Sequence, residues 1–398
     1  MDRRAATSVI FAGFFFLGMV FILWGVLLPD LAQNLAMNEV VSGAFFTLIS
    51  IGMILGAILG GKYAQKFDFM SLFAVLLVCV LLLLLAISFV QHWFWLLVGA
   101  LVLGMFASSL FTIGHTVIAR LHVERRSAMM GFMDFMFSLG TLAAPFFVSG
   151  LYLIEHDWRW PLRILAAGML VLAVYTWRVA HQGKKLVAPE EAKKNRKSLS
   201  YGDIIRRPVF IFLALAAFGY GMVEFGNANW FVSYAQNGRG FSGEQSRLIF
   251  AFFTAGMVVS RLVFALLLKW LTSHRLMLIL ATIMVTGCFM IKLAVDPVVM
   301  SWGNFMLGLG LGGLFPLMLS AAMDVDSDKG PIISGLCVIG SSIGVQVASF
   351  STGLWAHYAP LVTAFWVIPI GGAWLWAMTW AYSRFVKRHI AQVKLDVN

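Results

Sequence analysis

The chain has 398 residues, of which 61% are hydrophobic and only 12% are charged. Soluble proteins average about 45–50% apolar and about 25% charged residues, so this composition excludes a set of ordinary soluble domains. The net charge of +11 would suit a nucleic-acid-binding protein only with a basic patch on a soluble domain, which the sequence lacks.

Long apolar runs occur along the whole chain. A helix needs about 20 apolar residues to cross a bilayer core of about 30 Å. Runs of this length predict spans near 9–31, 41–61, 70–90, 95–119, 128–153, 161–180, 209–235, 246–268, 276–295, 300–322, 330–354 and 360–383. We therefore predict an all-α membrane protein with twelve transmembrane helices, because barrel strands alternate over only about ten residues. The first run follows MDRRAA without a small-residue cleavage site, so we expect a retained helix, not a signal peptide.

One long polar stretch, 182–207, separates the spans into two sets of six. We predict an N-terminal six-helix bundle (1–181), a basic linker (182–207) and a C-terminal six-helix bundle (208–398). An even number of spans puts the linker and both termini on one side, and that side carries 23 of the 29 Lys and Arg residues. This bias predicts that they are cytoplasmic, in a bacterial inner membrane. The net charge is then a topology signal, and we expect no nucleic-acid partner.

The sequence offers no cofactor site and no catalytic motif. Cys79, Cys288 and Cys337 each lie inside an apolar run, without the spacing of a disulfide framework or a metal site. The chain lacks H-E-x-x-H, G-x-S-x-G and P-loop patterns, and its loops are too short for a catalytic domain. We expect no metal, no cofactor and no enzymatic activity.

Two acidic residues lie well inside the predicted spans, away from their ends. A charge at the bilayer centre costs about 2.5–3.5 kcal/mol on insertion scales, so such residues are functional candidates by default. Glu224 lies about 15 residues, or about 22 Å, into the seventh span, near the midplane. Asp134 lies about one-third of the way through the fifth. Both are candidates for proton coupling, because a carboxylate in changing surroundings can load and release a proton; permanent interhelical hydrogen bonds are the alternative.

Other polar residues accompany these acids. Arg261 is a candidate for an ion pair or for an anionic substrate group. His115 is a candidate proton relay or a hydrogen-bonded core residue, and Asp30 a gate residue or a solvated helix end. The predicted substrate-binding residues, which could equally join helices, are Tyr220, Asn227, Trp230, Asp134, Glu224, Asn304 and Gln346. Glycines at 308, 310, 312 and 313, just before Pro316, are expected to weaken the tenth span.

Two six-span halves joined by a basic linker are typical of transporters built from repeats. The sequence resembles the major facilitator superfamily over essentially its whole length. The family's loop signature, Gly-x-x-x-Asp-Arg-x-Gly-Arg, corresponds here to GKYAQKFD at 61–68. Gly61 and one basic residue match, but Gln65 replaces the Asp. The resemblance implies two pseudo-repeated bundles, a substrate site near the midplane between the halves, and alternating access.

The second half resembles the fucose:proton symporter branch of that family. FGYGMVEFGNANWFVSYA, TAGMVVSRLVFALLL and GLGGLFPLMLSAAMD are similar to its helices seven, eight and ten, and FILWGVLLPDL and FMDFMFSLG agree in the first half. The last of these also resembles TsgA-like transporters. The branch has Gln at two positions that are occupied here by Asp134 and Glu224. The branch also has Glu-Asn-Pro on helix four, which this sequence lacks; His115 lies near the position of that Asn.

This resemblance implies a monomeric symporter that moves protons and a small, sugar-like solute across the bilayer. The two acids would equally suit a cationic, amino-bearing or metal-chelating solute. The alternative is a proton-coupled antiporter that exports a drug, a metabolite or a chelating compound. Gly131, Gly140, Ala144 and Pro145 come close to the Gly-Pro signature of drug antiporters, although Val148-Ser149-Gly150 keeps only one glycine of its Gly-Gly pair. The acids and the second half favour import.

Overall fold

The computed structural model describes residues 3–63, 67–181, 208–325 and 330–396, and every regular element in these ranges is helical. Twelve helical stretches among them are long and apolar enough to cross a membrane. The predicted all-helical fold with twelve spans is therefore confirmed. The predicted linker 182–207 lies outside the described residues, as do residues 64–66 of the loop signature.

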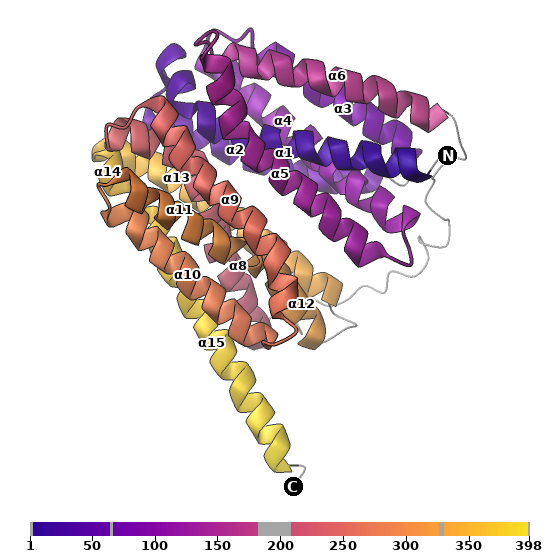
Figure 1. Ribbon diagram of the computed structural model, residues 1–398, viewed down its shortest axis with the longest axis vertical. Helices are drawn as coiled ribbons and strands as arrows, with labels where there is room; N and C mark the ends of the chain where they lie inside the picture. Colours follow the sequence, from indigo (N-terminus) through magenta and orange to yellow (C-terminus); the bar gives the residue numbers. More distant parts are fainter. Residues whose placement is uncertain (1–2, 64–66, 182–207, 326–329, 397–398) are drawn as a thin grey trace. The chain divides into compact units, whose positions relative to one another are not determined.

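The chain divides into two compact units, Met1–Arg196 and Lys197–Asn398. The helices of the first unit are α1 (Arg3–Asn34), α2 (Glu39–Tyr63), α3 (Phe69–Ile87), α4 (Trp93–Leu121), α5 (Arg126–Tyr152) and α6 (Arg159–His181). Those of the second are α8 (Pro208–Ser233), η2 (Tyr234–Gly238), α9 (Gly243–Leu267), α10 (Ser273–Leu293), α11 (Pro297–Gly312), α12 (Leu314–Val325), α13 (Gly330–Tyr358), α14 (Leu361–Ala364) and α15 (Val367–Asp396) (Figure 1).

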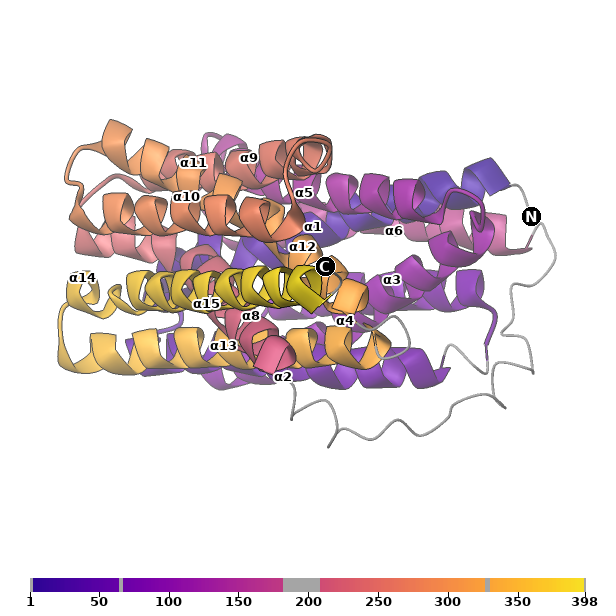
Figure 2. The same cartoon turned by 90° about the horizontal axis from the view of Figure 1, so that it is seen from below.

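The two units repeat one pattern of helix pairing. In the first, α1 packs against α5, α2 against α4, and α3 against α6. In the second, α8 packs against α13, α9 against α11, and α10 against α15, and both views place α10 beside α15 (Figures 1 and 2). Because α11 and α12 together form the fourth span of their unit, the order is the same in both. First packs on fifth, second on fourth, and third on sixth.

Glycines allow the first and fifth helices of each unit to touch backbone to backbone. A Cβ added to Gly140 of α5 would lie 1.9 Å from the carbonyl oxygen of Phe15 on α1. The same atom on Gly344 of α13 would lie 2.0 Å from the carbonyl oxygen of Phe218 on α8. Carbon–oxygen contacts shorter than about 3.3 Å are repulsive, so only glycine fits these crossings.

The tenth span is interrupted where the sequence predicted weakness. α11 ends at Gly312 and α12 begins at Leu314. Pro316 has no N–H to donate to the carbonyl of Gly312, so the helical ladder loses a hydrogen bond at that turn. Glycine adds backbone freedom at the same place.

Short polar signals fix several helix starts. Ser242 and Gln245 form a reciprocal capping box at the start of α9, which satisfies two backbone N–H groups that have no partner inside the helix. Asp296 accepts hydrogen bonds from two backbone N–H groups at the start of α11, and Pro297 occupies its first position, where a missing N–H costs nothing.

Candidate functional site

Glu224 lies in the middle of α8 with a donor and a cation beside it. The hydroxyl of Tyr220, one turn earlier, donates a hydrogen bond to the Glu224 carboxylate, and Arg261 of α9 interacts with that carboxylate electrostatically. Tyr220 is buried, whereas Glu224 and Arg261 are half-buried. The structure thus brings together three residues predicted from the sequence, and the cluster can hold an anionic carboxylate or exchange its partners.

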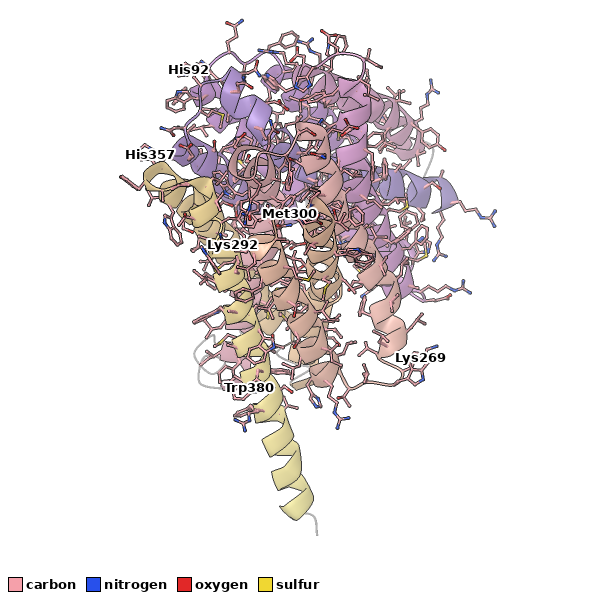
Figure 3. All side chains as sticks on the ribbon, turned by 60° about the vertical axis from the view of Figure 1, so that its left-hand side comes forward. His92, Lys269, Lys292, Met300, His357 and Trp380 are labelled. Carbon is pink, nitrogen blue, oxygen red and sulfur yellow. The ribbon has the colours of Figure 1, made fainter. Side chains whose placement is uncertain are left out.

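A second pair of predicted residues joins α8 to α11. Asn227 Nδ2 donates to Asn304 Oδ1 at 3.2 Å, and Asn304 Nδ2 donates to the carbonyl oxygen of Met300 at 3.1 Å. Met300 lies among the helices of the second unit (Figure 3). Both asparagines are 0% exposed, yet Asn227 Oδ1 has no hydrogen-bond partner among the described residues. An unpaired buried acceptor costs about 1–3 kcal/mol.

Trp230 of α8 bonds to α13, the helix that also carries Gln346. Trp230 is buried, and its Nε1 donates to the carbonyl oxygen of Ser349 on α13 at 3.2 Å. Asn229 Nδ2 donates to the Ser349 hydroxyl at 3.0 Å. Gln346 lies three residues earlier on α13 and is half-buried. Trp230 therefore contributes to the packing of α8 on α13.

The side chains of Asp134 and His115 are in contact in the first unit. His115 Nε2 of α4 lies 3.3 Å from Asp134 Oδ1 of α5, and the two side chains are 26% and 46% exposed. His115 Nδ1 lies 3.0 Å from the carbonyl oxygen of Phe111. The rings of Phe14 and Phe111 pack against the imidazole, with centroids 5.1 Å and 4.3 Å away. The sequence indicated each residue singly, and the structure joins them.

Asp30 lies at the opposite end of the first unit and is not a solvated helix end. Its side chain is only 13% exposed, and its carboxylate lies 3.5 Å from His156 Nε2. The Tyr152 hydroxyl donates to the same carboxylate at 2.9 Å. Sequence analysis missed Tyr152 and His156. Their signal was their place at the end of the fifth span and just after it, on the side where the first span ends.

His122, between α4 and α5, ties the start of α1 to the end of α4. Arg3 Nη2 lies 3.1 Å from His122 Nδ1, and Thr7 Oγ1 lies 2.7 Å from His122 Nε2. Thr7 donates its own proton to the Arg3 carbonyl, so His122 Nε2 must donate to Thr7 and Nδ1 must accept from Arg3. Burial, followed by the Arg3 charge, holds the pKa of His122 below its ordinary value of 6.5.

A cavity of about 710 Å³ opens at one end of the second unit. It is lined by residues 268–274, which follow α9 and include the start of α10, and by Ala321, Tyr382 and Val386. Lys269 and Trp380 mark that end of the unit (Figure 3). None of the predicted site residues lines this cavity.

Known proteins are similar to this chain over most of its length. The family model described as Major Facilitator Superfamily matches residues 9–345. The glucose/mannose transporter GlcP of Bacillus subtilis (strain 168) is 24% identical over 357 residues, which cover 86% of each chain. A protein TsgA homolog of Erwinia tasmaniensis is 20% identical over 360 residues, covering 88% of each.

Solved structures share the fold at low sequence identity. The nucleoside transporter NupG has a TM-score of 0.77 at 12% identity, covering 96% of this chain and 98% of that chain. A bacterial homolog of the human lysosomal transporter Spinster has a TM-score of 0.74 at 12% identity, covering 96% and 97%. The twelve spans, the repeated pairing and the match over most of the sequence agree. The chain belongs to the Major Facilitator Superfamily and is an integral membrane transporter rather than an enzyme.

Proposed function

We propose that this transporter takes up a small, sugar-like solute by proton symport with alternating access. The observation that carries the proposal is the Glu224 cluster. A carboxylate inside a membrane-spanning helix, with a hydrogen bond from a tyrosine and the charge of an arginine acting on it, is costly to keep unless it is used. Glu224 is the principal proton-coupling residue in this proposal, with Asp134 as the second.

The neighbouring amides suit a hydroxylated solute. Asn227 Oδ1 lacks a partner among the described residues, and a solute hydroxyl can donate to it. Tyr220, Asn304 and Gln346 supply further donors and acceptors, and Trp230 an apolar face. The name of the GlcP relative makes glucose and mannose the first solutes to test.

The decisive experiment is solute uptake into proteoliposomes with an imposed pH gradient. Symport predicts that protons enter with the solute. Glu224→Gln keeps the size and hydrogen bonding of the side chain but removes its titration, so uphill accumulation should be lost while solute exchange remains. Asp134→Asn is the comparison, because coupled acids can share one proton. Glu244→Gln, the same change at an exposed carboxylate on α9, is the control and should leave accumulation unchanged.

Three results would contradict the proposal. Uphill, pH-dependent accumulation by Glu224→Gln with loss in Asp134→Asn would reverse the assignment. Accumulation by both variants would make both acids structural, with His115 next to test. Proton movement opposite to the solute would favour the alternative antiporter, which the near match to the Gly-Pro signature on α5 supports.

The proposal includes an orientation. The Lys and Arg bias supports a cytoplasmic linker and cytoplasmic termini. In this proposal the protein acts as a monomer in a bacterial inner membrane. A cysteine introduced at Ser198 should resist an impermeant thiol reagent on intact cells and react after the cells are opened. Efficient labelling on intact cells would refute the orientation.

A further inference from the structure

The hydrogen-bond partners of His115 restrict where the protons on His115 and Asp134 can lie. Both ring nitrogens of His115 face acceptors. Nδ1 lies 3.0 Å from the carbonyl oxygen of Phe111, and a carbonyl can only accept. Nε2 lies 3.3 Å from Asp134 Oδ1, and an ionised carboxylate can also only accept.

A neutral imidazole carries one N–H, so it cannot satisfy both acceptors. With Nδ1–H fixed on Phe111, the Nε2–Oδ1 contact needs one more proton. That proton lies either on Nε2, giving an imidazolium beside a carboxylate, or on Asp134, whose O–H then donates to Nε2. Both arrangements contain the same number of protons. If the proton leaves, two lone pairs face each other at 3.3 Å, and the contact becomes repulsive.

We infer that His115 and Asp134 bind one shared proton as a unit, and that its release requires this contact between α4 and α5 to open. The inference rests on the proposed function only for its role in transport. The pair itself follows from the two distances. His115 acts together with Asp134 here, by holding the shared proton in position against the carboxylate.

The surroundings favour a fixed imidazole. The rings of Phe14 and Phe111 pack against it, so it has little freedom to turn away while the helices stay in place. The other charged residues on α4 and α5 have partners of their own. Arg120 of α4 lies over the ring of Phe69 at 4.4 Å, and Arg126 of α5 donates to the Ala119 carbonyl. On α1, the sequence between Arg4 and Asp30 contains no titratable residue.

The pair also lies where a proton would leave. His115 is six residues from the end of α4, about 9 Å, and Asp134 is eight residues from the start of α5, about 12 Å. In the proposed orientation, this is the cytoplasmic third of the membrane. A proton released there, as the contact opens, exits on the side to which the solute is delivered.

The test is nitrogen NMR of the full chain in lipid bilayers, with ¹⁵N in the histidine rings and ¹³C in the aspartate carboxyl groups. Loss of signals in His115→Gln assigns the residue. While the contact is closed, we expect a proton on Nδ1 and a second proton either on Nε2 or on the Asp134 carboxyl. In Asp134→Asn the amide donates to Nε2, so the second proton should be lost and His115 should become a neutral Nδ1–H imidazole.

His181 is a matched control. Its Nδ1 lies 2.9 Å from the carbonyl oxygen four residues earlier, as in His115, but no carboxylate of the described residues is within ion-pairing distance. Its signals should not change in Asp134→Asn. An unprotonated Nδ1 on His115, or neutral His115 touching ionised Asp134, would overturn the inference even if transport proves proton-coupled. A shared proton in a protein that moves no protons with its solute would support the pair and refute the proposed symport.

Discussion

The contact between α1 and α5 gives a stability prediction with its own internal control. In Gly140→Ala the new Cβ would lie 1.9 Å from the Phe15 carbonyl oxygen, about 1.5 Å short of an ordinary carbon–oxygen contact. The obstacle is backbone, so no side chain can turn aside and the helices must separate. Gly150, on the same helix, is exposed, and a Cβ added there would meet no atom within 4 Å.

Both substitutions gain the same helix propensity, about 1 kcal/mol for Gly to Ala. The difference between them therefore isolates the steric cost. Overpacking costs about 1–3 kcal/mol, and each kcal/mol changes the Tm of a unit of about 200 residues by about 2–4 °C. We expect Gly140→Ala to unfold about 2–12 °C below Gly150→Ala.

Thermal unfolding of the purified protein, followed by tryptophan fluorescence, measures this difference. The variant should also lose transport, because α5 carries Asp134 and α1 carries Phe14, which packs on His115. Equal Tm values for the two variants would show that α1 and α5 do not approach as closely as the structure has them, and that glycine is not required at this crossing.

Two further predictions concern the ends and the core of the units. The pKa of His122 lies below its ordinary value of 6.5, so its neutral form stabilises the fold above that value, and the stability should fall as the pH drops through the folded pKa. His122→Gln does not titrate and should flatten this part of a Tm-against-pH curve. An unchanged slope would refute this role of His122. Asn304→Leu should lower the free energy of unfolding by about 1–3 kcal/mol, because it leaves the buried Asn227 amide unpaired. Adding Asn227→Leu should restore much of the Tm. If Asn304→Leu alone is as stable as the parent, the hydrogen bond between the two asparagines is dispensable.

The spans were predictable because each needs only a run of apolar residues, and lipid imposes that run wherever the helix lies. The break near Gly313 was predictable because Pro316 and the glycines act locally. The partners of the polar residues were not. α8 is apolar around most of its circumference, so its periodicity does not show which residues face which neighbour. Trp230 was predicted to bind the substrate, and its bond to Ser349 of α13 had no signal in the sequence.

The pairing of His115 with Asp134 illustrates the same limit. The two residues are 19 positions apart on separate helices, and their contact depends on the rotation of α4 and α5 about their own axes. That rotation is set by packing, including the close approach of Gly140 to α1, and no sequence spacing encodes it. Sequence reasoning identified the costly residues, and the structure supplied their partners.

The two acids differ in the kind of partner they have, and this difference yields the last prediction. Asp134 faces a histidine, which can itself take the proton, whereas Glu224 faces Arg261, whose guanidinium stays charged. On Glu224 the guanidinium charge therefore favours the ionised carboxylate, and we expect a proton to load more readily when Arg261 withdraws or finds another anion. Arg261→Gln removes that competitor and should abolish uphill accumulation while leaving solute exchange. Arg261→Lys, which keeps the charge but not the planar fork, should retain part of the accumulation. Full accumulation by Arg261→Gln in the proteoliposome assay would show that the cation has no part in coupling.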